Sequence, residues 1–252
     1  MSKKILMKKF NEIKDIPIPV IGKKNCGIVL EELLNTTGGE FNIPDFYDIE
    51  IKAAELHPKK EITLFTHPPY GPEIFPMQYL SDKYGYPDHD YKKIKVLKGI
   101  ANAKRKSRIG LFYYYKLEVN DLDRRIYLNV YNKYFRLIDN SFYWDYDELQ
   151  EMLERKLKEL ALFIVKRRII DDEIYYVYND LYFYKLKGFA TFIDEIKKGN
   201  IYITINTGVN KTGYRVGKFV DHGCAFKIKL VNIENLFDIS LGLGIKKTQF
   251  PE

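Results

Sequence analysis

The stretch Ile43–Lys52, which reads Ile-Pro-Asp-Phe-Tyr-Asp-Ile-Glu-Ile-Lys, places carboxylates and an ammonium in an apolar frame. Successive side chains of a β-strand point to opposite faces, so Glu50 and Lys52 would share one rim while the flanking isoleucines pack into the other face. Asp45, at the turn into this strand, can bring its carboxylate to the same rim. Two close carboxylates repel each other unless a cation lies between them, and oxygen ligands suit Mg²⁺. The stretch therefore predicts a magnesium site.

A Glu-x-Lys pair by itself also describes an exposed strand face, because 30% of the residues are charged. Three features favour a site: a Pro-Asp pair just upstream, apolar residues that alternate with Glu50 and Lys52, and Glu31 on a preceding segment. That segment, 28–34, is expected to be a helix with its leucines on one face. An acid among these leucines lies near the edge of a core, where a metal ion or an ammonium would offset the cost of its burial.

The composition describes an ordered globular protein with a basic balance. The 252 residues are 46% hydrophobic and 15% aromatic, enough to form one large domain or two lobes around a cleft. Lysine and arginine number 41 against 34 acidic residues, which gives a net charge of +7. This balance favours an anionic partner such as nucleic acid, although many basic proteins bind none.

Cysteine usage and hydropathy indicate a cytoplasmic protein. Cys26 and Cys224 lie far apart and have no cysteine or histidine at metal-ligand spacing, so we expect neither a disulfide framework nor a zinc site. The basic N-terminus lacks the apolar run of a signal peptide, and no stretch approaches ~18 uninterrupted apolar residues. We therefore expect a reducing compartment and no membrane partner.

Hydrophobic patterning predicts a mixture of helices and strands. The strongest helical signal runs from Asp145 to Arg168, where leucines recur at helical spacing after the capping pair Asp145 and Glu148. Shorter segments are expected as strands or as a further short helix. The strands are 61–66, 174–178, 181–186, 201–205 and a tyrosine-rich hairpin of 109–119 with 125–131, and the helix is 189–197.

Six short motifs occur in a fixed order along the chain. They are Gly27-x-x-x-Glu31-x-x-Leu34, Pro44-Asp45, Ile49-Glu50-Ile51-Lys52, Leu64-Phe65-Thr66, Lys187-Gly188-Phe189 and Asp221-His222-Gly223-Cys224-Ala225-Phe226-Lys227-Ile228. In order and spacing, from about residue 22 to 230, the set resembles the MvaI/BcnI family of type II restriction endonucleases, which are relatives of the mismatch-repair nickase MutH.

The resemblance implies the α/β (α+β) fold of a PD-(D/E)xK nuclease. Its mixed central sheet, flanked by helices, would carry the site, and two lobes would surround a DNA-binding cleft. The whole chain, 1–252, would form one restriction-endonuclease-like unit, with a catalytic lobe over approximately 20–130 and a DNA-recognition lobe over approximately 131–235.

The resemblance also implies a role for each residue of the first site. Asp45 and Glu50 would ligate Mg²⁺, with Mn²⁺ as a substitute, and Lys52 would stand beside the attacking water and the scissile phosphate. Glu31, which fits the family spacing better than Glu32, would assist them. Bound Mg²⁺ polarises a phosphoryl oxygen and acidifies water, and a lysine can stabilise charge on the pentacoordinate phosphate.

Base recognition requires other side chains, because bases are read by hydrogen bonds in the grooves. A glycine-rich segment, 210–229, would be an ordinary flexible surface loop if the resemblance were set aside. With the resemblance, its polar side chains become candidates for DNA contact. These candidates are Lys211, Arg215, Lys218, Asp221 and His222, joined by His67 and Tyr70 from the proline-rich loop after the strand at 61–66.

These features lead us to expect a Mg²⁺-dependent, sequence-specific endonuclease for double-stranded DNA. The resemblance implies a monomer that cuts the two strands in separate nicking events, paired in its host with a DNA methyltransferase that protects the same site. One alternative is a MutH-like nicking enzyme that awaits activation by another protein, and another is a DNA-binding module with an inactive nuclease site. An RNA-associated protein is disfavoured because no aromatic-glycine RNA motif is present.

Overall fold

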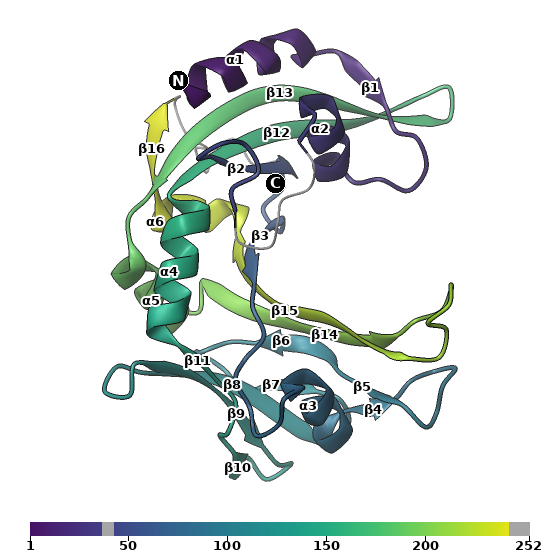
Figure 1. The fold of residues 1–252 in the computed structure, drawn as a ribbon, viewed down its shortest axis with the longest axis vertical. Helices are drawn as coiled ribbons and strands as arrows, with labels where there is room; N and C mark the ends of the chain where they lie inside the picture. The colour runs from purple at the N-terminus through teal and green to yellow at the C-terminus, as the bar shows by residue number, and fades with distance from the viewer. Residues whose placement is uncertain (37–42, 242–252) are drawn as a thin grey trace. The chain divides into compact units, whose positions relative to one another are not determined.

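A computed structural model describes residues 1–36 and 43–241 of the chain. The chain forms two compact units, each assembled from separate stretches of sequence (Figure 1). Unit 1 contains Met1–Ile62, Glu151–Thr191 and Lys229–Glu252, and unit 2 contains Thr63–Gln150 and Phe192–Ile228. None of the described helices is long and apolar enough to cross a membrane.

Unit 1 is built around a mixed sheet of five strands. These strands are β1 (Pro17–Pro19), β2 (Glu50–Glu55), β12 (Glu159–Ile170), β13 (Glu173–Leu186) and β16 (Phe237–Leu241). The order is β1-β13-β12-β2, and β16 also pairs with β13. β2 runs parallel to β12, whereas the other pairings are antiparallel.

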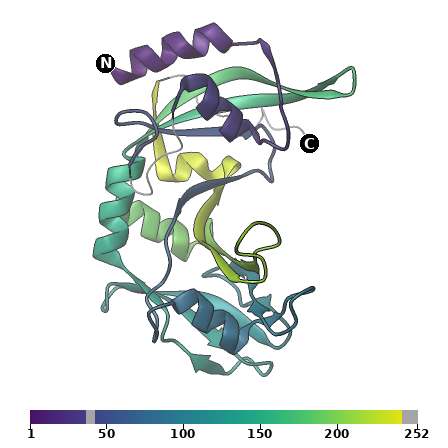
Figure 2. The same cartoon turned by 45° about the vertical axis from the view of Figure 1, so that its right-hand side comes forward.

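Two helices, α1 (Ser2–Ile13) and α2 (Cys26–Leu34), lie next to the long β12–β13 hairpin (Figure 2) and pack on one face of this sheet. Their buried side chains form one apolar cluster with alternate residues of β12 and with Ile51 of β2. Because side chains alternate along a strand, Glu50 and Lys52 point to the opposite face of the sheet. After β15, the short helices η1 (Leu230–Asn232) and α6 (Ile233–Leu236) lead into β16.

The single long helix expected from Asp145 to Arg168 is wrong in its second half. The helix, α4 (Tyr146–Leu157), ends at Leu157, and the strand β12 begins two residues later. Every residue from 160 to 165 is buried. A continuous apolar run contains apolar residues at both helical and strand spacing, so the spacing cannot distinguish a helix from a strand. Such a run is typical of a strand that is covered on both faces.

Unit 2 contains two larger sheets, a small one, the helix α3 and most of the helix α5. The first sheet has the order β10-β9-β8-β7 with β11 on β9, the second has the order β3-β15-β14-β6, and the small one pairs β4 with β5. The bounds are β3 (Glu61–Thr66), α3 (Pro76–Tyr84), β4 (Tyr86–Pro87), β5 (Lys95–Val96), β6 (Lys98–Ala101), β7 (Ser107–Ile109), β8 (Tyr113–Asn120), β9 (Arg125–Tyr131), β10 (Leu137–Asp139), β11 (Tyr143–Asp145), α5 (Phe189–Lys197), β14 (Ile201–Val209) and β15 (Phe219–Lys229).

The core of unit 2 is aromatic. The ring of Phe226 stacks on that of Phe65 at 4.7 Å and meets the rings of Phe192 and Trp144 at 5.8 and 5.6 Å. The indole N–H of Trp144 donates to the carbonyl of His67 at 2.9 Å, which satisfies its polar group inside the core. The expected strand at 61–66 and helix at 189–197 are confirmed as β3 and α5. The tyrosine-rich hairpin is confirmed as β8 with β9, although β8 begins at Tyr113 and not at residue 109.

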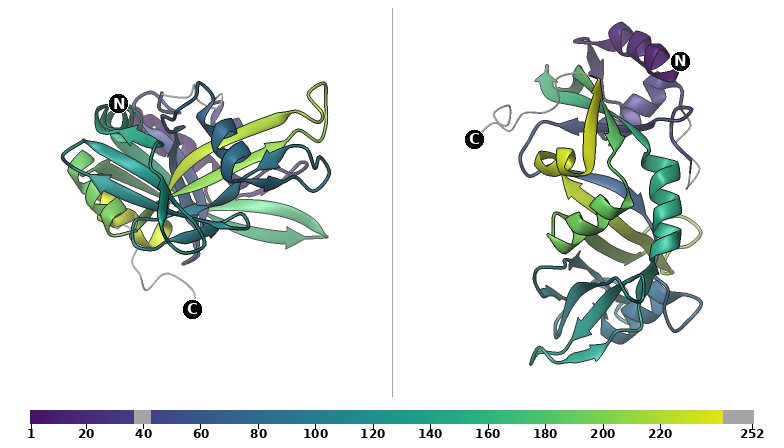
Figure 3. Two further views of the ribbon diagram at one scale, coloured as in Figure 1. Left: turned by 90° about the horizontal axis from the view of Figure 1, so that it is seen from below. Right: turned by 90° about the vertical axis from the view of Figure 1, so that its left-hand side faces the viewer.

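An irregularity interrupts the pairing of β14 with β15, which form a long hairpin (Figure 3). Ile205 faces Cys224 and Thr207 faces Asp221, so β15 contains one residue more than β14 between these pairs. Gly223 adopts a φ of +87° there, and a Cβ on it would lie 2.3 Å from Cγ2 of Thr66. Such a bulge redirects the side chains beside it.

We expect Gly223→Ala to destabilise unit 2 by about 2–4 kcal/mol, from the left-handed backbone and from the collision with Thr66. Thr66→Ser removes the colliding methyl group and should restore the steric part of the loss in the double variant, but not the backbone part. Denaturant unfolding followed by the fluorescence of Trp144, the single tryptophan, measures this. An alanine variant as stable as the wild type would contradict the bulge geometry.

Candidate active site

A tight turn folds Asp45 back onto the start of β2. The N–H of Phe46 donates to the carbonyl of Ile49 at 3.0 Å, and the N–H of Ile49 donates to the carbonyl of Phe46 at 2.9 Å. Tyr47 adopts a φ of +55° within this turn. The carboxylate of Asp45 then accepts the backbone N–H of Ile51 at 3.0 Å, which fixes it beside the strand.

Glu50 lies deeper than the rim that the strand pattern predicts, since its side chain is fully buried. Its Oε1 is 2.5 Å from Nζ of Lys52 and 3.6 Å from Nζ of Lys156. Its Oε2 is buried and has no hydrogen-bond partner. One oxygen of this carboxylate is therefore neutralised by ammonium groups, and the other is left available.

The electrostatics of Glu50 favour a further cation. Burial raises the pKa of its carboxyl group, the ammonium of Lys52 opposes this shift, and the carboxylate of Asp45 adds to it. Burying an ionised carboxylate with an unsatisfied oxygen is unfavourable unless a cation or donor approaches that oxygen. The unpartnered Oε2 of Glu50 and the nearby carboxylate of Asp45 therefore fit a hard divalent metal ion.

A divalent ion at this site would have two carboxylates of the protein as ligands, those of Asp45 and Glu50. Among residues 1–36 and 43–241, no three His, Cys, Asp or Glu side chains gather as a metal cage. Mg²⁺ is usually held by one or two carboxylates together with substrate phosphates and water rather than by an all-protein cage. The pair Asp45 and Glu50 matches that mode of binding.

Glu31 and Glu32, adjacent on α2, have different surroundings. Asn25 caps this helix, because its side-chain oxygen accepts the N–H groups of Gly27 and Ile28. Glu32 is exposed and pairs with Lys24 at 2.6 Å. For Glu31, burial and then the charge of Asp45 raise the pKa, while Lys52 lowers it. Glu31 is therefore the acid that lies in the electrostatic field of the site.

A cavity of about 390 Å³ opens beside Asp45. Lys9 of α1 lines it and donates to the carbonyl of Leu34 at 3.0 Å. The remaining lining comes from the end of α2 and from the turn at Phe46 and Tyr47. The cavity thus borders Asp45 from the side of α1 and α2, and Glu50 and Lys52 are not among its lining residues.

Lys156 is a site residue that the sequence did not reveal. It lies in the last turn of α4, and its side chain is only 15% exposed. The helix leads directly into β12, where Leu160 stands opposite Glu50 in the parallel register. That register brings Lys156 to Glu50, and no local pattern encodes it. In the sequence, Lys156 is one of several basic residues on an amphipathic helix.

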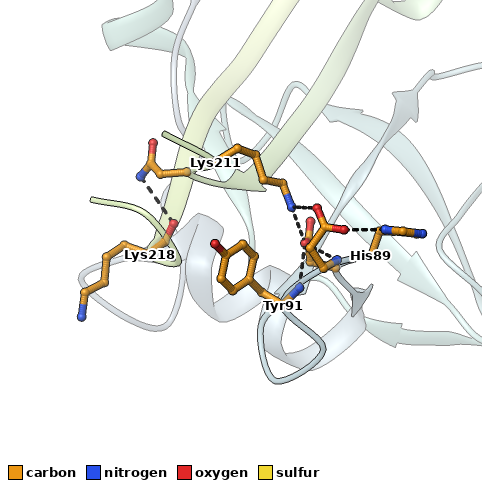
Figure 4. Close-up of polar contacts among 7 residues, drawn as sticks. His89, Tyr91, Lys211 and Lys218 are labelled. Atoms are coloured by element: carbon orange, nitrogen blue, oxygen red, sulfur yellow. Dashed lines mark hydrogen bonds and ion pairs between the residues drawn. The ribbon is translucent and has the colours of Figure 1, made fainter. Parts of the chain in front are cut away.

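The candidate DNA-contacting residues of the glycine-rich segment lie in unit 2, in the loop that joins β14 to β15 and on the first part of β15. In Figure 4, Lys211 points toward an acidic turn beside Tyr91, whereas Lys218 points away from it. The guanidinium of Arg215 lies 5.3 Å from the ring centre of the exposed Tyr214. The expected contacts of Lys211 with DNA compete with the acids that already hold it.

Asp221 and His222 are exposed on β15, immediately before the bulge at Gly223. The carboxylate of Asp221 accepts the N–H of Gly223 at 2.7 Å, which orients it. The imidazole of His222 lies beside Gly208, where a Cβ would approach its Nε2 to 3.2 Å. The bulge and a glycine on the neighbouring strand thus set the direction of both side chains.

His67 and Tyr70 line a second cavity in unit 2, of about 320 Å³. His67 Nε2 lies 3.2 Å from a carboxylate oxygen of Glu148, and the charge of Glu148 raises the pKa of Tyr70. Tyr70 exchanges two backbone hydrogen bonds with Tyr143 and stacks on its ring at 5.3 Å. The catalytic candidates therefore all lie in unit 1, and the DNA-contacting candidates all lie in unit 2.

Comparisons with known proteins show which family this chain resembles. The model of the MvaI/BcnI restriction endonuclease family matches residues 7–237. A solved structure of restriction endonuclease MvaI with its cognate DNA substrate is similar to this chain, with 29% sequence identity and a TM-score of 0.86. The match covers 94% of this chain and 96% of the MvaI chain. A solved structure of MvaI in the absence of DNA is also 29% identical and has a TM-score of 0.62. That match covers 95% of this chain and 96% of the MvaI chain.

The comparison with curated proteins finds no match. The predicted resemblance and the mixed α/β nuclease fold are nevertheless confirmed by the family model and by the likeness to MvaI. Because the family model covers most of the chain, the protein belongs to the MvaI/BcnI restriction endonuclease family and is a site-specific DNA endonuclease of type II.

Proposed function

We propose that this endonuclease hydrolyses double-stranded DNA with Mg²⁺, which Mn²⁺ can replace, and that it acts as a monomer that nicks the two strands in turn. The observation that carries the proposal is the buried carboxylate of Glu50, whose Oε1 is held by lysines while Oε2 has no partner. The structure of MvaI with its cognate DNA supports duplex DNA as the substrate.

A phosphodiester is an anion that repels a hydroxide-like nucleophile, so the enzyme must supply positive charge where negative charge develops. Asp45 and Glu50 would hold the divalent ion, Glu50 through Oε2 and Asp45 through the oxygen that does not accept the N–H of Ile51. When bound, such an ion supplies charge to the phosphoryl oxygen and makes a nearby water more acidic. Glu31, in the field of Asp45, would accept hydrogen bonds from water in this site.

Lys52 can turn its ammonium from Glu50 to the scissile phosphate, because its side chain is 25% exposed whereas that of Glu50 is buried. There it would stabilise the charge of the pentacoordinate phosphate and orient the attacking water. Lys156 would then remain as the ammonium next to Glu50. Cleavage would thus use two lysines in different roles, one at the phosphate and one at the carboxylate.

We assign cleavage to unit 1 and base recognition to unit 2, where the candidates Arg215, Asp221 and His222 lie. In the host, a DNA methyltransferase that protects the same sequence would be a functional partner, and the cytoplasm would be the compartment. A MutH-like nicking enzyme that needs an activator would produce only open circles from plasmid, and a binding module with an inactive site would produce neither circles nor fragments.

The main test incubates supercoiled plasmid with purified protein and Mg²⁺. We expect discrete fragments that share an end sequence, with nicked circles appearing before linear DNA. Asp45→Asn and Glu50→Gln should each slow cleavage by roughly 10³-fold or more, because each removes an ionised metal ligand. Gel-shift binding in Ca²⁺ should change by less than about tenfold, since the reading residues remain.

EDTA is the control for the metal ion, and it should abolish cleavage until excess Mg²⁺ or Mn²⁺ is added. Full activity of Glu50→Gln, or cleavage in EDTA, would contradict the assignment of the site. Fragments without a shared end sequence would contradict base recognition.

Lys156→Met should lower the single-turnover cleavage rate by roughly 10–100-fold, the effect typical of losing a group that supports a metal ligand. Arg155→Met is the matched control, because Arg155 is exposed and pairs with Glu151, at 3.4 Å, on the same helix. Equal rates for the two variants would show that Lys156 has no part in cleavage. A thermal unfolding curve for each variant separates lost activity from lost folding.

A further inference from the structure

The turn between β4 and β5 is a rigid acidic support. Asp88 is only 9% exposed, and its Oδ1 accepts the N–H groups of Asp90 at 3.0 Å and Tyr91 at 3.1 Å. The backbone N–H of Asp88 donates to the carbonyl of Ile94 at 2.8 Å. Hydrogen bonds within the turn itself therefore orient the carboxylate and the backbone of Asp88.

Lys211 of the β14–β15 loop docks on this support (Figure 4). Its Nζ lies 2.6 Å from Oδ1 of Asp88 and 2.8 Å from Oδ2 of Asp90, and it also lies 4.9 Å from the ring centre of Tyr91. The ammonium of Lys211 holds the pKa of Asp88 at about 2, so the pair stays charged at neutral pH. Its charge is therefore already balanced within unit 2.

The other end of the loop rests on the same turn. Gly217 has a φ of +75°, and a Cβ on it would lie 3.0 Å from Cε1 of Tyr91. Between the two ends, the base of the loop is closed by backbone hydrogen bonds of 2.9 Å from Asn210 to Lys218 and from Gly217 to Asn210. The loop is thus held at Lys211, at Gly217 and at its base.

The tip that these contacts support carries the exposed groups of the loop. Tyr214 is 92% exposed, and Arg215 lies over its ring. An exposed tip on a fixed base is a suitable arrangement for reading DNA, because the loop does not have to be ordered when the duplex binds.

We infer that the acidic turn 88–91 positions the loop 210–218 for DNA recognition, and that Lys211 is a positioning residue rather than a phosphate contact. The inference rests on the proposed function of unit 2 in reading bases. A phosphate contact would require Lys211 to leave two carboxylates, and those carboxylates would then face the DNA backbone. A lysine that is already paired releases no counterion from DNA, so the salt dependence of binding distinguishes the two roles.

The first experiment needs no DNA. Limited trypsin digestion of the full chain should cut after Arg215 and Lys218 about tenfold faster in Lys211→Met and in Asp88→Asn than in the wild type, because both changes loosen the loop. Trypsin should cut Lys211→Arg at close to the wild-type rate, because an arginine can pair with both acids. Equal rates in all four proteins would overturn the positioning role.

The second experiment measures binding to two DNA duplexes in Ca²⁺. One duplex contains the recognition site that the fragment ends identify, and the other has the same length and a scrambled sequence. Lys211→Met and Asp88→Asn should each weaken binding to the cognate duplex by about tenfold and leave binding to the scrambled duplex unchanged. Neither change should alter the salt slope, which is the slope of the logarithm of the binding constant against the logarithm of the salt concentration. The double variant should be no weaker than either single one, because both lose the same contact.

Lys218→Met is the matched comparison, since it removes the same charge from the same loop without touching the acidic turn. If Lys218 contacts a phosphate, its replacement should lower the magnitude of the salt slope by about 0.9. The inference is overturned if Lys211→Met lowers the slope in the same way, or if Asp88→Asn tightens binding by removing a negative charge.

These measurements distinguish a failure of the proposed base recognition from a failure of the inference about the acidic turn. If the wild type binds both duplexes equally, the proposed function of base recognition is wrong, and the inferred role in DNA reading falls with it. If the wild type is selective and the variants keep the same selectivity, only the inference about the acidic turn is wrong. A circular dichroism spectrum of each variant shows whether its fold is retained.

Discussion

The burial of a single carboxylate, that of Glu50, is the constraint around which unit 1 is arranged. Removing an ionised group from water costs several kcal/mol unless other charges surround it. Here two ammonium groups approach one oxygen, and the other oxygen has no partner. Such an arrangement is poor for stability and good for holding a cation, as is typical of catalytic sites. Asp45 is tied by a hydrogen bond to the same strand, so both carboxylates are placed before a metal ion binds.

In both units, a lysine from a distant stretch of sequence neutralises fixed carboxylates. The parallel register of β2 with β12 brings Lys156 to Glu50 in unit 1, and the β14–β15 loop brings Lys211 to Asp88 in unit 2. The acids are held in place locally, in one case by a strand and in the other by a turn. The lysines arrive through tertiary structure, so each pair forms only when its unit has folded.

The sequence was informative where chemistry and structure are local. The alternation around Glu50 and the Pro-Asp turn predicted a strand with two nearby carboxylates, and the order of short motifs predicted the family that the comparisons confirm. The extent of the helix after Asp145 was wrong, because the apolar run at 160–165 fits either structure until its burial on both faces is known. Lys156 was missed and the ion pairs of Lys211 were unforeseen, since strand register and loop packing leave no local pattern.

The interleaving of the two units fixes the order in which the protein can be completed during synthesis. The chain passes between the units at residues 62, 150, 191 and 228. Asp45 and Glu50 leave the ribosome first, but β12 and Lys156 follow only after 63–150, most of unit 2, has been made. A nascent chain therefore holds both carboxylates without the strand that supports them. Unit 1 is completed only by β16, which follows both stretches of unit 2, so the segments that would select the target sequence have been synthesised before unit 1 is complete.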